Sequence, residues 1–505
     1  MPNRPGIGVV LRSGGLNGIP PIVKAAESAV HEAMSDASLR TLFERQRSAF
    51  ARERMPTLRA RRDRLERLLR MIRAHSGEIE TAISADFSGR SVHETRFAEL
   101  LLIETGIRHM LRHLRRWCAP RRIPTAFHFL PARNRIVRQP LGVVGVISPW
   151  NYPWQLAIVP AAAALAAGNR VLIKPSEITP RSSALMRQLV ERNFDPTELA
   201  VVTGDATMGQ AFAALPFDHL FFTGSTAVGR KVAEAAARNL TPVTLELGGK
   251  SPAILDNSVE RGDVESTIAR SIAFGKLINA GQTCIAPDYV LAPREKIDHF
   301  AEAVLAAARE LYPNLTANAD YTAIVTERHR ARLGEMLAEA RAGGARVVEV
   351  PNDIGASAGR KFPLTLVIGA TESMRVLREE IFGPILPIVA YGDLGEAIDY
   401  VNGRERPLAL YWYGRDTAHR DRVLHETLAG GVAVNDCVWH FAQEDAPFGG
   451  VGASGMGAYH GERGFLTFTK EKPVFYQSRW NALWLIHPPY GRAFETLVAL
   501  LKRIA

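Results

Sequence analysis

Short apolar runs alternate with helical stretches between residues 142 and 249, and this alternation constrains the fold more than any other feature of the chain. The runs are "GVVGVIS", "NRVLIKP", "LAVVTG", "HLFFTG" and "VTLELGG", and stretches of helical periodicity such as "SALMRQLVERN" separate them. Each run is hydrophobic almost throughout, which is typical of strands buried on both faces. Strand–helix alternation of this kind predicts a parallel sheet covered by helices on both sides.

A second alternating region extends from about residue 251 to 435, with apolar runs such as "YVLAPR", "ARVVEV" and "ILPIVAY". At 505 residues the chain exceeds what one hydrophobic core normally supports, so more than one domain is expected. Residues 39–117 have helical spacing, and residues 124–142 suggest two short strands around a turn at 131–134. The sequence therefore predicts two α/β domains and a small arm.

The formal net charge of +10 raises the question of a nucleic-acid partner, because arginines gather at residues 59–73 and 112–122. The first stretch also places leucines and an isoleucine at helical spacing and has no interleaved aromatic residue, and neither stretch contains a nucleic-acid motif. We interpret the arginines as the solvated face of a helix. No nucleic-acid partner is expected.

Membrane and redox features point to a cytoplasmic protein. The longest apolar stretch, residues 156–167, contains Pro160 and is shorter than the roughly 20 residues that a membrane-spanning helix needs. The tail has an apolar stripe between residues 494 and 504, and packing on the protein body is preferred to membrane binding. Cys118, Cys284 and Cys437 are too far apart to suggest a disulfide framework or a metal site, so a reducing cytoplasm is expected.

A polar turn between a predicted strand and a predicted helix is the best candidate for a nucleotide site. Thr223, Gly224 and Ser225 follow the run "LFF", and a helical stretch begins near Val228. The start of a helix offers free N–H groups and a positive dipole end to a pyrophosphate, although many such turns bind nothing. By contrast "GVGASG" at 450–455 fits a glycine fingerprint but is flanked by loop-like sequence, so a glycine-rich loop near a site is expected there.

Four further side chains carry possible chemistry, each with a plain structural alternative. Lys174 and Glu177 lie at a strand end, as a surface lysine and a helix-start glutamate or as a site where the carboxylate accepts hydrogen bonds from ribose hydroxyls. Glu246 ends a strand before two glycines, as a structural acid or a general base. Asn151 in "SPWNYPW" is either structural or a donor to an oxyanion, and Cys284 in "NAGQTCIAP" is a buried thiol or a nucleophile.

In combination these motifs resemble the aldehyde dehydrogenase superfamily. The stretches "PWNYPW", "KPSEITP", "FTGSTAVGR", "LELGGKSP", "NAGQTCIAPDYV", "EEIFGPILP" and "PFGGVGASGMGAYHG" occur in the order typical of that family, from about residue 39 to 473. The forms "QTCIAPDYV" and "YHG" resemble the class 3 branch. Within it, the stretches "SAFARERMPTLRARRDRLERL" and "FLPARNRIVRQPLGVVG" are most similar to coniferyl aldehyde dehydrogenases.

The resemblance implies an aldehyde dehydrogenase-like α/β fold with a Rossmann-like cofactor domain, a catalytic domain and a small β oligomerisation arm. The implied division is an N-terminal extension (1–37), an NAD-binding domain (38–123 and 141–246), a catalytic domain (247–440), an arm (124–140 and 455–480) and a C-terminal tail (481–505). A homodimer is also implied.

The resemblance assigns a role to each matched residue. Cys284 is implied as the nucleophile, Asn151 and the Cys284 N–H as oxyanion donors, and Glu246 as the base that hydrolyses a thioester. The implied cofactor is NAD, with NADP as the alternative, and no metal is expected. The implied cofactor-binding residues are Ser148, Trp150, Lys174, Ser176, Glu177, Gly204, Thr223, Gly224, Ser225, Val228, Leu247, Gly248, Glu380 and Phe382.

Substrate choice is only weakly encoded. Trp439, His440 and Phe441 lie where the family lines its aldehyde tunnel, and Trp and Phe suit an aromatic or a long apolar aldehyde. The expected reaction is oxidation of a coniferyl-type aldehyde to its carboxylate, and the alternative is a long-chain aliphatic aldehyde. A variant that transfers the acyl group to coenzyme A and a catalytically silent NAD-binding relative are weaker alternatives.

Overall fold

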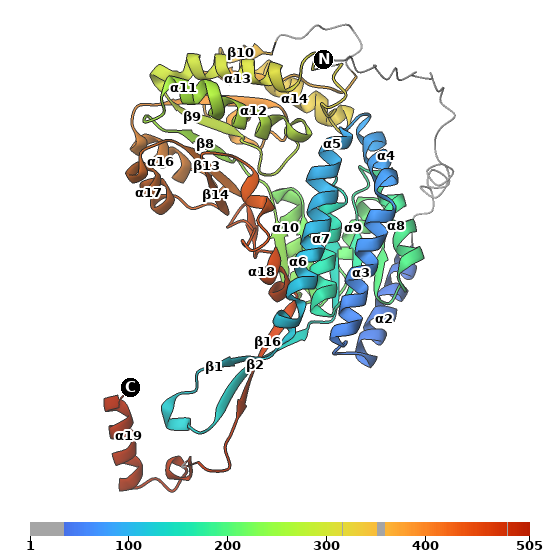
Figure 1. The fold of residues 1–505 in the computed structure, drawn as a ribbon, viewed down its shortest axis with the longest axis vertical. Helices are drawn as coiled ribbons and strands as arrows, with labels where there is room; N and C mark the ends of the chain where they lie inside the picture. The colour runs from blue at the N-terminus through green and yellow to red at the C-terminus, as the bar shows by residue number, and fades with distance from the viewer. Residues whose placement is uncertain (1–34, 316, 351–358, 482, 505) are drawn as a thin grey trace, which may run out of the picture.

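A computed structural model describes residues 35–504 apart from 316, 351–358 and 482, and Figure 1 shows its arrangement. Two large sheets form the body, and a narrow arm extends away from it. Most of the expected N-terminal extension (1–37) lies outside the described residues. No helix in the described ranges has the length and apolarity to cross a membrane.

The first large sheet has six strands in the order β15-β7-β6-β3-β4-β5. All neighbouring strands run parallel except β15, which pairs with β7 in antiparallel fashion. The five parallel strands are those expected from the apolar runs, so the prediction of a parallel sheet is confirmed. The strands are β3 (Val143–Ile147), β4 (Arg170–Lys174), β5 (Leu199–Val201), β6 (His219–Thr223), β7 (Val243–Glu246) and β15 (Gly455–Met456).

Helices cover this sheet on both faces, and α7 is the most deeply buried of them. Its small alanine side chains allow close packing against α3 and α6, and every residue of α7 is buried. The expected helical character of residues 39–117 is confirmed. The helices are α2 (Asp36–Arg52), α3 (Leu58–Ala74), α4 (Ser76–Phe87), α5 (Val92–Thr95), the π-helix η1 (Arg96–Leu100), α6 (Leu101–Cys118), α7 (Gln155–Ala167), α8 (Pro180–Asn193), α9 (Ala206–Ala213) and α10 (Thr226–Ala237).

The arginines of α3 are less solvated than the sequence suggested. The leucine stripe of α3 is buried as expected, but Arg61 and Arg64 are buried as well. Arg64 pairs with Glu198 at 2.9 Å, and Arg61 donates to the carbonyl of Ala167 at 2.6 Å. Polar partners from other elements offset much of the cost of burying these two guanidinium groups.

The second large sheet has seven strands in the order β10-β11-β12-β9-β8-β13-β14, and only the β10–β11 pair is antiparallel. Its strands are β8 (Pro252–Leu255), β9 (Tyr289–Pro293), β10 (Arg346–Glu349), β11 (Thr365–Ile368), β12 (Ile385–Tyr391), β13 (Ala409–Tyr413) and β14 (Gly431–Val434). The helical elements of this region are α11 (Arg261–Asp263), η3 (Val264–Ile268), α12 (Ala269–Leu277), η4 (Ile278–Gly281), η5 (Arg294–Lys296), α13 (Ile297–Leu311), α14 (Glu327–Ala342), α15 (Arg375–Arg378), α16 (Leu394–Asn402), α17 (Thr417–Glu426) and η6 (Trp439–Ala442).

The arm is a three-stranded antiparallel sheet in the order β1-β2-β16. It corrects two expectations. The strand before the turn, β1 (Arg121–Ile123), precedes Pro124, and residues 127–129 form the 3-10 turn η2 (Phe127–Phe129) before β2 (Arg133–Pro140). Of the range 455–480, only β16 (Thr469–Tyr476) joins the arm, because β15 pairs with β7 and α18 (Gly461–Thr467) packs on α7.

The C-terminal tail lies beyond the arm. It contains the 3-10 turn η7 (Leu483–Ile486) and the helix α19 (Arg492–Ile504), which contact each other. The expected packing of this helix on the protein body is not what the structure shows, because β16 carries the chain away from the large sheets (Figure 1). The apolar side chains of α19 are consequently only half-buried.

Candidate active site

Three polar side chains lie where adjacent parallel strands of the first sheet end. Ser148 follows β3, Thr223 ends β6 and Glu246 ends β7, and these strands are neighbours in the order β7-β6-β3. All three residues are buried, yet their side-chain oxygens make no hydrogen bond to any residue that the structure describes. Buried polar groups are normally paired, so this edge has the unmet hydrogen-bonding capacity of a ligand site.

The polar turn expected at residues 223–226 does lead from a strand into a helix. Ser225 is the N-cap of α10, and its hydroxyl accepts a hydrogen bond from the exposed backbone N–H of Val228. The Gly224 N–H donates to the carbonyl of Glu246 at 3.0 Å, which ties this turn to the end of β7. A side chain at Gly224 would collide with Phe222. The turn therefore presents a helix N-terminus beside Glu246.

Lys174 and Glu177 form one unit after β4. The Lys174 side chain is buried, and its Nζ donates to Glu177 at 3.3 Å and to the carbonyl of Pro175 at 3.1 Å. Burial lowers the pKa of Lys174, and the Glu177 carboxylate beside it opposes that shift. The other two residues expected nearby shape loops: Ser176 caps the N–H of Ile178, and Gly204 has a φ of 153° directly after β5.

Glu380 and Phe382 lie in the segment that leads from α15 into β12 of the second large sheet, and this segment packs against the end of β7. A Cβ atom on Gly248 would lie 2.2 Å from a Glu380 carboxylate oxygen, so the carboxylate packs directly against this glycine. Burial and the nearby Asp288 raise the pKa of Glu380 to about 7. The Phe382 ring packs edge-on against Trp150, with centroids 5.3 Å apart. Leu247, next to Gly248, donates its N–H to the glycine-rich loop at Ser454.

Cys284 lies in a turn that follows α12 and η4. Asn279, Ala280 and Gly281 all have positive φ values, of 50°, 52° and 72°. Left-handed backbone at alanine and asparagine is unfavourable and persists only where surrounding contacts enforce it. The Asn279 amide provides such contacts, because it donates to the carbonyls of Gln282 and Asn151, each at 3.0 Å.

Asn151 belongs to the same network. Its side-chain amide donates to the Gln282 carbonyl at 3.1 Å, two residues before Cys284. The hydroxyls of Tyr152 and Thr283 lie 2.7 Å apart, which adds a second link next to the cysteine. The structure thus brings Asn151 and Cys284 together from segments that are 133 positions apart in the sequence.

The charges around Cys284 favour its neutral thiol. The side chain keeps partial solvent exposure, but the surrounding protein and the carboxylates of Glu380 and Glu246 raise the pKa of Cys284 to about 12. Burial also raises the pKa of Glu246 well above its usual range, since no cation pairs with it among the described residues. A neutral thiol beside a strongly basic carboxylate is an arrangement suited to proton transfer between them.

Aromatic rings cluster near the cysteine turn, against Tyr152 and Ile278. The Trp439 ring stacks on Phe274, with centroids 5.8 Å apart and planes 10° apart, and Phe274 in turn stacks on Phe97 at 6.4 Å. Phe441 packs with Tyr152 in the same apolar cluster. His440 points elsewhere, toward Tyr411 and Phe448, and burial lowers its pKa to about 4.

Sequence reasoning missed the acidic scaffold behind this site. Glu99 accepts hydrogen bonds from the N–H groups of Trp154 and Gln155 and pairs with Arg90 at 3.0 Å, and Arg90 donates to the Asn151 carbonyl at 2.9 Å. Glu94 binds the Asn279 N–H. In the stretch "VHETRFAEL", Glu94 and Glu99 have the spacing of an ordinary exposed helix, so no local signal distinguishes them.

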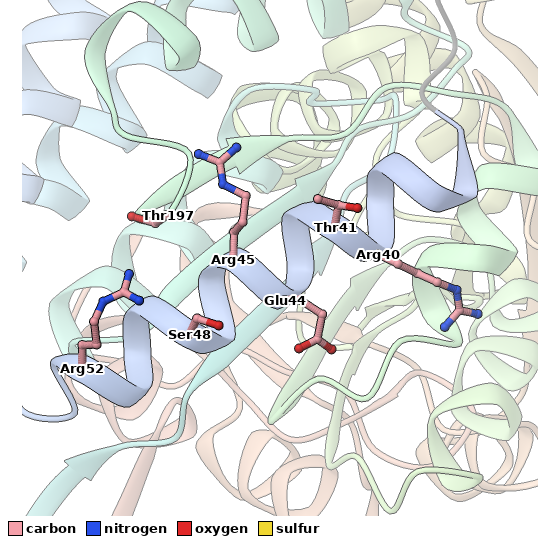
Figure 2. Close-up of a pocket in the computed structure, with 7 residues that line it drawn as sticks. All are labelled: Arg40, Thr41, Glu44, Arg45, Ser48, Arg52 and Thr197. Carbon is pink, nitrogen blue, oxygen red and sulfur yellow. The ribbon is translucent and has the colours of Figure 1, made fainter.

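A separate hollow lies on the outer side of α2, and Figure 2 shows the side chains that surround it. Six of them come from α2, and the seventh, Thr197, precedes β5. The arginines project outward from the helix, and none of the predicted site residues is part of this hollow. It is an open groove on the surface and is distinct from the cysteine site.

Comparison with known proteins supports one family. The model of the Aldehyde dehydrogenase family matches residues 19–474. A "Probable coniferyl aldehyde dehydrogenase" of Pseudomonas aeruginosa is 49% identical over 460 residues, which is 91% of this chain and 95% of that protein.

Two solved structures give the same result. The substrate-bound state of Staphylococcus aureus AldH has a TM-score of 0.86 and 35% identity, over 92% of this chain and 99% of that one. The P. syringae AldA indole-3-acetaldehyde dehydrogenase, in complex with NAD+, has a TM-score of 0.79 and 25% identity, over 88% and 90%. The chain belongs to the aldehyde dehydrogenase family.

Proposed function

We propose that this aldehyde dehydrogenase oxidises an aromatic, coniferyl-type aldehyde to its carboxylate, with Cys284 as nucleophile and NAD as hydride acceptor. The observation that carries the proposal is the convergence of Cys284, Asn151 and Glu246. Asn151 is hydrogen-bonded to the cysteine turn, and the unpaired Glu246 lies near enough for its charge to raise the pKa of the thiol. A nucleophile, an oxyanion donor and a base are the groups that acyl chemistry requires.

The residues at the strand ends fit a dinucleotide. The unpaired oxygens of Ser148 and Thr223 and the start of α10 at Ser225 suit the pyrophosphate side, and Lys174 with Glu177 suits the adenosine ribose. Glu380 and Phe382 suit the nicotinamide end, since Gly248 leaves room for the carboxylate. Glu177 favours NAD over NADP, because its carboxylate repels a 2′-phosphate.

The remaining residues of the cofactor set support these contacts indirectly. Trp150 fixes the Phe382 ring, and Leu247 fixes the end of β7 against the glycine-rich loop. Ser176 and Gly204 shape the loops after β4 and β5. Gly224 and Val228 form the entry to α10.

The chemistry begins at the thiol. Cys284 Sγ attacks the aldehyde carbon while the thiol proton passes to a carboxylate, and Glu246 is the proposed acceptor because it is unpaired and unusually basic. The Asn151 amide and the Cys284 N–H stabilise the oxyanion of the thiohemiacetal. NAD, held at its nicotinamide end by Glu380 and Phe382, would supply the hydride acceptor that turns the thiohemiacetal on Cys284 into a thioester.

After releasing the thiol proton to solvent, the Glu246 carboxylate takes a proton from the water that attacks the thioester carbon. The C–S bond then breaks, and Cys284 leaves as a thiolate that is reprotonated. The buried setting of Glu246 makes it a stronger base than an ordinary carboxylate. The presence of this base favours hydrolysis over acyl transfer to coenzyme A.

The aromatic approach supports the substrate assignment. Stacked rings at Trp439, Phe274 and Phe97 offer flat surfaces for a planar cinnamyl group. The name of the P. aeruginosa relative points to the same substrate class. A homodimer built on the arm and a cytoplasmic location, supported by three free cysteines, complete the proposal.

The test is NADH formation at about 340 nm with coniferaldehyde and with a long-chain aliphatic aldehyde, followed for wild type, Cys284→Ala and Glu246→Gln. Wild type should prefer coniferaldehyde, and Cys284→Ala should form no NADH. Glu246→Gln should turn over about 10²- to 10⁴-fold more slowly, the usual effect of removing a general base. It should show no fast burst of NADH, because the thiol proton loses its proposed acceptor as well. Steady turnover by Cys284→Ala would contradict the assignment of the nucleophile.

A further inference from the structure

A buried aspartate connects the cysteine turn to the segment that carries Glu380. Asp288 lies four residues after Cys284 and is 3% exposed. Its Oδ1 accepts the N–H of Ile381 at 3.1 Å, and its Oδ2 accepts a hydrogen bond from the ammonium of Lys250. Its own N–H donates to the carbonyl of Ser251 at 2.8 Å. One carboxylate thus joins β8, the start of β9 and the Glu380 segment.

Lys250 and Arg332 fix the backbone on both sides of Glu380. Besides binding Asp288, Lys250 donates to the carbonyls of Val376 and Glu379, each at 2.9 Å. Arg332 donates to the carbonyl of Glu380 at 3.3 Å and to that of Ile381. The segment forms no regular element, so these side chains replace the hydrogen bonds that a helix or strand would supply.

Lys276 adds a second cation to this cluster. The residue is completely buried, and its Nζ lies 3.8 Å from Asp288 Oδ1 but makes no hydrogen bond to any of the described residues. A buried ammonium without hydrogen bonds is costly to keep for structure alone. When Lys250 and Lys276 are both charged, the single negative charge of Asp288 balances only one of the two positive charges. An ionised Glu380 balances the other.

We propose that Asp288, held between Lys250 and Lys276, is a positioning residue that fixes the Glu380 segment and, with Lys276, sets the charge of Glu380 for cofactor binding. This inference rests on the proposed function, because it takes Glu380 as a contact of the nicotinamide ribose. It ties the position of the cofactor carboxylate to the turn that carries Cys284. A disturbance at Asp288 is therefore expected to act on cofactor binding through the Glu380 segment.

The electrostatic signs make the role testable. The charged or titratable groups that face Glu380 are Asp288, Lys250, Lys276, Arg332 and Cys284. The negative charge of Asp288 raises the pKa of Glu380, so its removal lowers that pKa. Burial lowers the pKa of Lys276 to about 8, and below that pH its cation attracts the ionised carboxylate, so its removal raises the pKa of Glu380. A purely structural role predicts no such opposition.

The experiment measures NAD binding to the full chain by calorimetry between about pH 5 and pH 9, for wild type, Asp288→Asn and Lys276→Met. In wild type the affinity should rise as pH passes the pKa of Glu380, since the ionised carboxylate accepts hydrogen bonds from ribose hydroxyls. The midpoint of that rise should move to lower pH in Asp288→Asn and to higher pH in Lys276→Met. Above the midpoint, Asp288→Asn should weaken binding about tenfold, the scale of one lost charged hydrogen bond.

Asp256→Asn is the matched control. Asp256 is equally buried and also binds a backbone N–H, at Ser258, and a ring nitrogen of His419, but it contacts no part of the Glu380 segment. This variant should leave the midpoint and the affinity unchanged. If Asp288→Asn fails to fold, Lys276→Met still decides the question, because it breaks no hydrogen bond.

Unshifted midpoints in both variants would overturn the inference while leaving the proposed function intact. Absence of NAD binding by wild type would instead contradict the proposed function. In steady-state assays Asp288→Asn should raise KM for NAD and leave KM for the aldehyde within about twofold. Asp288→Glu, which restores the charge, should return the pH midpoint toward that of wild type.

Discussion

The thiol of Cys284 is held where its neutral form is favoured, because protein surrounds it and the nearest charges are the carboxylates of Glu380 and Glu246. A nucleophilic cysteine normally depends on a nearby cation or helix N-terminus to favour the thiolate. Here the described residues offer two bases instead. Activation by proton transfer at the moment of attack therefore fits this site better than a standing thiolate.

This view predicts low reactivity of Cys284 toward alkylating agents in the protein without cofactor. Because its pKa is raised to about 12, the thiolate fraction at pH 8 is about a thousandfold below that of a free thiol. The rate of carbamidomethylation by iodoacetamide should keep rising through pH 10 rather than level off near pH 9. Peptide mass spectrometry resolves Cys284 from Cys118 and Cys437, and a plateau near neutral pH would show that an unseen cation stabilises the thiolate.

At the scale of elements, the π-helix η1 sets the shape of the site. Its extra residue places Glu99 toward the interior, where the carboxylate meets Arg90 and the backbone N–H groups of Trp154 and Gln155. Arg90 then holds the carbonyl of Asn151. The amide proposed for the oxyanion is thus positioned by an ion pair whose two side chains have no solvent exposure.

We predict that Arg90→Met lowers the free energy of unfolding by about 3–5 kcal/mol, because it leaves Glu99 as an unpaired buried charge. The double variant Arg90→Met/Glu99→Gln should recover part of that loss. Urea denaturation measures both.

Arg96→Met is the control. Arg96 lies on η1, as Glu99 does, but in its ion pair with Glu80 the arginine side chain is exposed to solvent. It should change stability much less. Equal losses for the two arginine variants would show that burial of the Arg90 pair is not what stabilises this region.

The local parts of the fold could be predicted from the sequence, and the long-range parts could not. Apolar runs such as residues 143–147 identify strands because burial on both faces requires continuous hydrophobicity. Cys284 and Glu246 were found through motifs of a few residues. The pairing of Asp288 with Lys250 and Lys276 depends on which elements meet in space, and a buried lysine has the same local sequence signature as an exposed one.

The arm was predicted in outline and misplaced in detail for a related reason. Its first strand is only three residues long and precedes Pro124, while "FHFL" looks like a strand but forms a 3-10 turn. Short strands at the edge of a molecule lack the apolar periodicity that marks core strands. The division into domains and the dimer remain predictions.

At the scale of the whole molecule, the exposed surface of the arm argues for a partner. Phe127, Leu130, Phe475 and Tyr476 are each about half exposed. Phe475 and Tyr476 end β16, and Phe127 and Leu130 lie between β1 and β2, in the arm that extends from the body (Figure 1). A three-stranded sheet has little core of its own, and its outer strands present unpaired backbone groups. A second copy of the chain, covering these residues with its own arm, would bury the apolar side chains and shield the unpaired backbone groups.

We therefore predict that the protein is a dimer of the 55.4 kDa chain and that Phe475→Asp with Tyr476→Asp converts it to a monomer. Light scattering after gel filtration gives the mass directly. Leu240→Asp is the control, since Leu240 is 88% exposed on the body, between α10 and β7, and should leave the dimer intact. The site lies in the body and the arm residues touch none of its members, so a monomeric variant should still bind NAD. A wild-type monomer would mean that the apolar arm serves another contact, and a dimer that survives both aspartates would place the interface elsewhere on the molecule.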